Sequence, residues 1–171
     1  MLWKRAKSEP DEKPPERPGG GLEPVRIFTT DTIIDGWVDT GGQRLSDILS
    51  AEDLLSVSPL PDPTEADWFV VERERMLLVV PPLHTSDRAL RPHRVKRPIL
   101  VLSGHYVVRG RVHMIAGIAL DPFLARSGRH FLPVTEAWIT SSERREIDEQ
   151  HPALLINVRS TAQRLQLNVI E

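Results

Sequence analysis

The feature that most constrains this chain is a glycine that occurs twice, 74 residues apart, in the middle of an extended run. The segment TIIDGWVDT has Gly36 at its centre, and the segment YVVRGRVHM has Gly110 in the same place. A glycine inside a strand usually marks a bend or the close approach of another backbone. A small barrel needs such a bend in its longest strand. The two glycines therefore predict two small β-barrels in tandem, and the alternative is two unrelated bulges in one large sandwich.

The segments around the two glycines also correspond in order. In each half, short runs alternate apolar with polar residues, which is typical of half-buried strands, and a helical segment follows the strand that carries the glycine. Asp47 and Asp121, within those helical segments, are again 74 residues apart. We therefore infer an internal duplication. We expect a mainly β protein with two tandem five-stranded Sm-like or SH3-like barrels, short helices and a disordered N-terminal tail.

The expected boundaries follow from composition and from the alternating pattern. The tail is rich in charged residues and proline, and a linker rich in proline and arginine separates the halves. The predicted divisions are 1–24 (tail), 25–82 (first barrel), 83–97 (linker) and 98–171 (second barrel). The predicted strands are 25–31, 32–39, 68–73 and 75–82 in the first half, and 98–104, 105–114, 131–139, 153–158 and 164–169 in the second. A short helix is expected within 44–55, and the last two strands are expected to pair with each other.

Charge and composition argue against several functional classes. The 22 Lys and Arg residues nearly balance the 24 Asp and Glu residues, so bulk attraction to nucleic acid or an anionic membrane is disfavoured. The absence of cysteine excludes disulfides, thiolate catalysis and cysteine-based zinc sites. No apolar run reaches the roughly 18 residues that cross a bilayer, and the start lacks the apolar core of a signal peptide, so we expect a cytoplasmic protein. The nucleophile-elbow, Walker A and dinucleotide-binding motifs are also missing. We therefore expect no enzymatic activity, no cofactor and no metal site.

One segment resembles a known family. VVERERMLLVVPP, residues 70–82, is similar to the second sequence motif of the Sm-like small barrels, in which apolar residues lead into Arg-Gly, an apolar strand and a proline. Arg73 falls on the arginine of that motif, with Glu74 in place of its glycine, and Arg159 falls similarly in INVRS of the second half. The base-binding asparagine of the first motif is absent from both halves. The RLSD segment, residues 44–47, resembles a segment of an uncharacterised bacterial family. The resemblance implies the barrel more than it implies RNA binding.

Two groups of cations are candidate binding residues. The linker group could hold phosphates with a strong salt dependence, or could dock onto the acidic first half. The second group lies along the glycine-bearing strand of the second half, where alternating residues share one face. Such a face suits an anion or an acidic partner, and the alternative is a solvated outer surface. The linker group is Arg88, Arg91, Arg94, Lys96 and Arg97, and the strand group is Arg109 and Arg111 with His105 and His113.

The first half contains an acidic counterpart to that strand. Asp35 and Asp39 flank Trp37 there. An exposed tryptophan beside acids would suit contact with a basic surface. The alternative is a tryptophan that covers its own barrel.

Three functional hypotheses remain. The leading one is a non-catalytic interaction or scaffold module, with a protein partner or self-association. The second is an RNA- or ssDNA-binding protein that uses Arg73, Arg159 and the linker cations. The third is an enzyme with a site between the barrels, which would need a buried cleft lined by His105 and His113.

Overall fold

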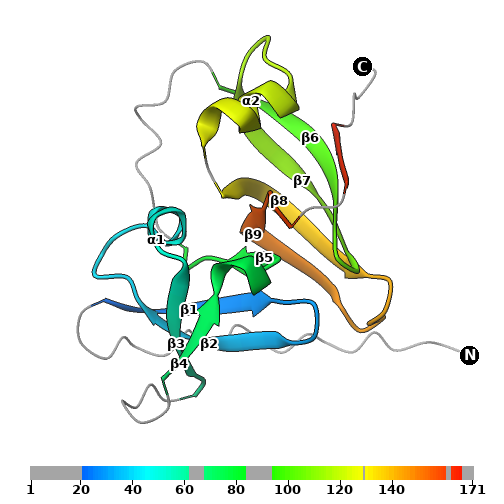
Figure 1. Ribbon diagram of the computed structural model, residues 1–171. Helices are drawn as coiled ribbons and strands as arrows, with labels where there is room; N and C mark the ends of the chain where they lie inside the picture. The colour runs from blue at the N-terminus through cyan, green and yellow to red at the C-terminus, as the bar shows by residue number, and fades with distance from the viewer. Residues whose placement is uncertain (1–20, 62–67, 84–93, 129, 161–162, 167–171) are drawn as a thin grey trace, which may run out of the picture.

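The computed structural model describes residues 21–61, 68–83, 94–128, 130–160 and 163–166. The expected tail up to residue 20, and residues 84–93 of the expected linker, lie outside this range. The described chain is mainly β with two short α-helices (Figure 1), so the predicted fold class is confirmed at that level. The elements are β1 (Leu22–Phe28), β2 (Ile33–Asp39), α1 (Leu45–Ala51), β3 (Leu54–Pro59), β4 (Phe69–Glu72), the 3-10 helix η2 (Arg73–Arg75), β5 (Leu78–Val80), β6 (Arg94–Ser103), β7 (Tyr106–Ile115), α2 (Leu120–Ser127), β8 (Phe131–Ser141), β9 (Asp148–Asn157) and β10 (Gln163–Gln166).

The strands form one continuous antiparallel arrangement. We call residues 21–83 the N-terminal half and residues 94–166 the C-terminal half. The hydrogen-bonded order is β10-β6-β7-β8-β9-β5-β1-β2-β3-β4, so the sheet is open across the described residues, with β10 and β4 at its ends. Each half has the same internal order, in which its fifth strand is followed by its first, second, third and fourth. The halves meet where β9, the fourth strand of the C-terminal half, pairs with β5, the fifth strand of the N-terminal half.

The two glycines lie where the third strand of each half passes close to the second. A Cβ atom on Gly36 would lie 2.5 Å from the backbone oxygen of Ser58, and one on Gly110 would lie 2.3 Å from Cγ1 of Val134. Neither glycine has a left-handed backbone. The close approach of a neighbouring strand is therefore what requires glycine here, which confirms one of the two reasons that the sequence suggested.

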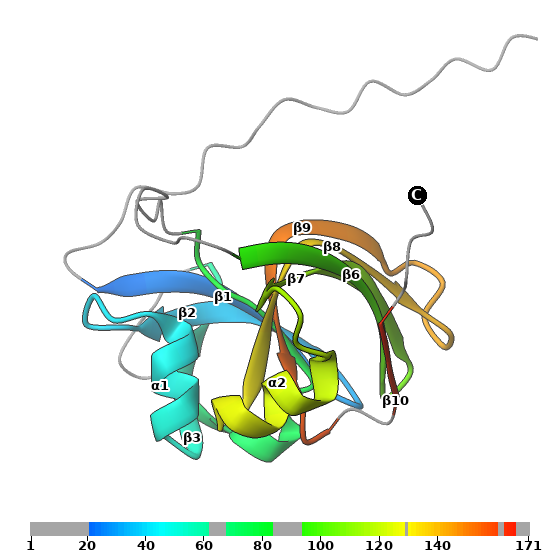
Figure 2. The same ribbon diagram turned by 90° about the horizontal axis from the view of Figure 1, so that it is seen from above.

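Each half contributes side chains to the hydrophobic core of the other. The core of the C-terminal half includes Phe28, Leu77 and Leu78 from the N-terminal half. The core of the N-terminal half includes Phe131 and Leu155 from the C-terminal half. Figure 2 shows the two curved parts side by side, with a helix in each. The halves therefore share an interface, which adds burial to two units that are each small.

Several local predictions differ from the structure. The segment 54–59 is the strand β3, whereas the sequence pattern had included its leucines in the helical segment; α1 ends at Ala51 because Glu52 is already extended. The strand β6 begins at Arg94, within the expected linker. The last two strands do not pair with each other: β10 pairs with β6, while β9 pairs with β8 and β5. The alternation of apolar and polar residues predicts which side chains lie on each face of a strand. It does not predict which strands are neighbours, because these pairings depend on how the sheet curves.

Candidate interaction surface

The strand β4 is an exposed edge with apolar side chains. In the described part of the chain β4 pairs with β3 alone, so one side of its backbone has no strand beside it. Val70 on β4 is 56% exposed, Leu54 on β3 is 58% exposed, and Phe69 at the start of β4 is 37% exposed. Ser56 is directly opposite Val70, so Leu54 and Val70 lie on the same face of this two-strand ribbon. An apolar edge of this kind is a template for pairing with another chain.

The glycine contacts give the exact correspondence between the two halves. The Cβ position of Gly36 is closest to Ser58 O and to Cγ1 of Val57, and that of Gly110 is closest to Cγ1 of Val134, followed by Thr135 O. Val57 therefore corresponds to Val134. Moving three residues back along each strand pairs Leu54 with Phe131.

The cross-strand register extends this correspondence to the fourth strands. Ser56 is opposite Val70 in the N-terminal half, and the corresponding Pro133 is opposite Leu155 in the C-terminal half. Val70 therefore corresponds to Leu155.

These corresponding residues have opposite environments. Phe131 is 2% exposed and Leu155 is 4% exposed, because both pack into the core of the N-terminal half. They are the two residues of the C-terminal half in that buried cluster, and their counterparts Leu54 and Val70 are both more than half exposed. The face that is buried at the junction of the halves is thus left in solvent at the β4 end of the sheet.

The junction between the halves shows how the edge of a fourth strand can be paired with another strand and buried. Leu155 is opposite Val79 and Ile156 is opposite Leu78 across the antiparallel β9–β5 pair. The Asn157 backbone N–H donates to the oxygen of Leu77 at 3.0 Å. The buried Asn157 side chain also donates to the backbone oxygens of Arg73 and Met76, at 3.1 and 2.9 Å. Strand pairing, apolar burial and an amide bridge together hold the halves.

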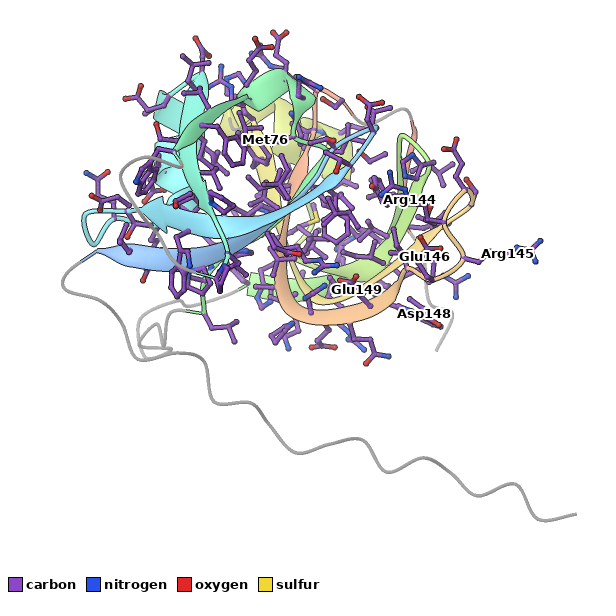
Figure 3. All side chains as sticks on the ribbon, turned by 90° about the horizontal axis from the view of Figure 1, so that it is seen from below. Met76, Arg144, Arg145, Glu146, Asp148 and Glu149 are labelled. Atoms are coloured by element: carbon purple, nitrogen blue, oxygen red, sulfur yellow. The ribbon has the colours of Figure 1, made fainter. Side chains whose placement is uncertain are left out.

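Charged groups close the solvent side of the junction. Arg26 on β1 pairs with Asp35 on β2 at 3.0 Å and with Glu149 on β9 at 2.9 Å. His151 Nε2 lies 2.9 Å from the same Glu149. In Figure 3 Glu149 lies on the ribbon between the halves, while Arg145 of the β8–β9 turn points away from the molecule. Asp35 of the N-terminal half thus pairs with Arg26 of the same half, rather than with the basic strand of the C-terminal half.

The two arginines of the family resemblance lie near each other but differ in role. The Arg73 side chain is 14% exposed and donates to the oxygens of Leu49 and Glu52 at the end of α1, at 3.3 and 3.2 Å, and to the carboxylate of Asp53. Arg159 is exposed. Burial lowers the pKa of His130, and the charges of Arg73 and Arg159 lower it further, which places both cations near that ring. Arg73 therefore anchors the end of a helix.

The remaining candidate cations form a separate group on β6 and β7. Lys96 and Arg111 each lie 2.9 Å from the carboxylate of Glu136, which has a left-handed backbone at a bulge of β8. The hydrogen bond from Lys96 is the main cause that lowers the pKa of Glu136. Arg109 lies over the ring of Trp138 at 5.8 Å. Arg94 is exposed and Arg97 is half-buried on β6, whereas Arg91 lies outside the described residues.

Two residues that the sequence made candidates for a contact face are buried. His105 lies in the β6–β7 turn and is 9% exposed, with its ring against Tyr106, so it does not share the outer face of Arg109 and Arg111. It is also separated from His113 by eight residues of strand, about 26 Å, so the structure does not bring the two histidines together. Trp37 is 3% exposed, and its indole N–H donates to the oxygen of Pro61. The prediction that Trp37 covers its own half is confirmed, and the exposed alternative is wrong.

The described residues contain no group of three or more side chains suited to hold a metal ion. A shallow hollow of about 370 Å³ lies between α1 and the turn after β2, with Asp39 and Glu52 on its wall. Neither helix of the described chain is long and apolar enough to span a bilayer.

Comparison with known proteins adds no relative. No protein-family model matches the sequence, and neither a curated protein nor a solved structure matches the chain.

The sequence pattern alone missed the β4 edge. Val70 and Leu155 both belong to short apolar strands and look equivalent before folding. A signal was present in the repeated order of segments, because aligning the fourth strands of the two halves pairs these residues. The sequence did not show which of the two fourth strands, β4 or β9, is covered by the other half.

Proposed function

We propose that this chain is a non-catalytic interaction or scaffold module that binds an extended segment of protein along β4. The observation that carries the proposal is the open apolar edge, on which Val70 and Leu54 are 56% and 58% exposed beside an unpaired strand backbone. A segment added there gains backbone hydrogen bonds from the edge and apolar contacts from alternate side chains. The same two contributions hold β9 against β5 within the chain.

The repeated strand order supports a finer proposal about architecture. In each half the fifth strand precedes the first in the sheet order, and the third strand passes close to the second at a glycine. We propose that each half is a duplicated five-stranded module of the Sm-like or SH3-like kind. The duplication then presents two similar surfaces, one used internally at the junction and one available to a partner.

Photo-crosslinking in the native host tests the function. A benzophenone amino acid at position 70 should give one dominant protein adduct after irradiation. The same amino acid at position 115 is the matched control, because Ile115 is 55% exposed and belongs to β7, which six strands separate from β4 in the hydrogen-bonded order. Leu54→Lys should remove most of the adduct formed at position 70. Identical adducts at both positions, or none at either, would overturn the proposal.

The nucleic-acid alternative predicts a different result. Micromolar binding of a fluorescent mixed-sequence RNA or ssDNA, weakening steeply with salt, would favour it. Arg159→Ala is the suitable variant, because Arg73 also holds α1 through its hydrogen bonds. Lys96 of the linker group and Arg111 of the strand group are already paired with Glu136, and the scaffold proposal predicts no salt-dependent binding.

A further inference from the structure

We propose that the segment bound at the β4 edge is β10 of a second copy of this chain, so that copies join head to tail. This inference rests on the proposed function, because it uses the same edge and names the partner. Its basis is the order of strands. Inside the chain, the fourth strand of one half pairs with the fifth strand of the other. At the ends of the sheet stand a fourth strand, β4, and a fifth strand, β10.

The exposed side chains at β4 match the buried ones at the internal junction. Val70 takes the place of Leu155, and Leu54 takes the place of Phe131. At the junction these positions are 4% and 2% exposed, because the neighbouring half covers them. A second copy placed in the same way would cover Val70 and Leu54, which are among the most exposed large apolar residues described.

The junction also predicts the register between copies. Gly36 is opposite Val25 and Gly110 is opposite Ile99, so β1 and β6 correspond with the same 74-residue spacing. Ile27 therefore corresponds to Val101.

The partners of these two residues fix the edge strands. Ile27 is opposite Val79 on β5, and Val101 is opposite Arg164 on β10. Because Val79 is opposite Leu155 at the junction, the backbone of Val70 is expected opposite that of Arg164 in a second copy.

This mode of association differs from a two-fold dimer. A β4–β10 contact uses two different surfaces, so it is heterologous, and it continues from copy to copy until a ring closes or a filament grows. A β4–β4 contact would instead be self-complementary and would stop at a dimer. The two modes therefore predict different cross-links and different masses.

Engineered cysteines test the register in the full-length chain. The natural sequence has no cysteine, so each introduced thiol is unique. One preparation carries Val70→Cys and a second carries Arg164→Cys, and the two are mixed and mildly oxidised. Opposed residues of an antiparallel pair have Cα atoms about 4.5–5.5 Å apart, which a disulfide can bridge. The expected product is the mixed disulfide, while Ile115→Cys with Arg164→Cys should give little.

Solution mass tests the association without any cross-link. Light scattering over a concentration series should give masses above the 19.3 kDa of one chain. Val70→Lys places a charge on the edge and should weaken association about tenfold or more, with the melting temperature of the monomer retained. Ile115→Lys is the control at nearly equal exposure and should leave the mass unchanged. Leu54→Lys provides a second variant on the same face.

The outcomes separate this inference from the proposed function. A dominant disulfide between two Val70→Cys chains would overturn head-to-tail pairing in favour of a two-fold contact. A monomeric mass with no mixed disulfide would also overturn it. If position 70 then captures a different protein in the host, the proposed function stands without this partner. If position 70 captures nothing, both fail.

Discussion

The two glycines occupy corresponding positions, but we expect replacement by alanine to destabilise the protein more at Gly36 than at Gly110. We also expect a second substitution to restore stability more fully at Gly110. Gly36→Ala would place a Cβ atom 2.5 Å from the backbone oxygen of Ser58 and 2.5 Å from Cγ1 of Val57. Gly110→Ala would place it 2.3 Å from Cγ1 of Val134 and 3.1 Å from the nearest backbone oxygen. The severe contact is thus partly with backbone at Gly36 and with one methyl group at Gly110.

The magnitude follows from overpacking. Forcing an extra methyl group into a packed region costs about 1–3 kcal/mol of unfolding free energy. Replacing glycine by alanine returns about 0.4–1 kcal/mol by reducing the freedom of the unfolded chain. We expect a net loss of about 1–2 kcal/mol for Gly110→Ala and more for Gly36→Ala. For a chain of this length, each kcal/mol lowers the melting temperature by about 2–4 °C.

A double-mutant cycle, measured by urea unfolding and circular dichroism, tests the cause. Val134→Ala removes the methyl group that meets a Cβ at Gly110, so the Gly110→Ala/Val134→Ala pair should be more stable than the sum of the single changes by about 1 kcal/mol or more. Val57→Ala should rescue Gly36→Ala less, because the Ser58 oxygen stays in place. Additivity within about 0.5 kcal/mol at the first pair would refute the close-approach explanation.

Three further predictions concern the side chains of Tyr106, Asn157 and Arg159. Burial raises the pKa of Tyr106, the single tyrosine of the chain. Absorbance at 295 nm should therefore show a pKa above the ordinary value of 10.0 in the folded protein and near that value in urea. The free energy of unfolding should fall as the pH rises from the unfolded pKa through the folded pKa. Asn157→Ala removes two donors to buried or partly buried backbone oxygens at the junction and should cost about 2–3 kcal/mol in urea unfolding. Arg159→Ala should raise the pKa of His130 toward its usual value in an NMR titration, because a nearby positive charge is removed. An unchanged pKa would show that the charge of Arg159 does not act on His130.

Much of the strand pattern could be predicted, because it depends on local alternation. The positions of Gly36 and Gly110 correctly indicated close approach of a neighbouring strand. The prediction failed at 54–59, where two adjacent leucines continue a helical pattern even though the chain has already become extended at Glu52. Leucine spacing alone cannot distinguish the last turn of a helix from the first residues of a strand.

The candidate surface depended on pairings that are distant in sequence. Trp37 between two acids looked suitable for an exposed contact, yet it is 3% exposed, because this part of β2 is buried and the indole N–H donates to the oxygen of Pro61. Arg73 looked like a ligand-binding arginine, yet its guanidinium group reaches carbonyl groups at the end of α1. A charged residue type does not reveal whether its partner is a ligand or the chain's own backbone.

The repeated strand order explains why the two ends of the sheet should be complementary rather than merely exposed. Joining two open modules through a fourth strand and a fifth strand uses one edge of each and leaves the other edge of each free. An edge that is never used is commonly protected by lysine, proline or inward-pointing charge. The strand β4 has the sequence FVVE, with its one charge at the end, and Val70 is exposed at its centre. Because a fourth strand is already paired with a fifth strand once within the chain, a second copy can bury β4 by the same kind of strand pairing, with Arg164 at the register position of Val79.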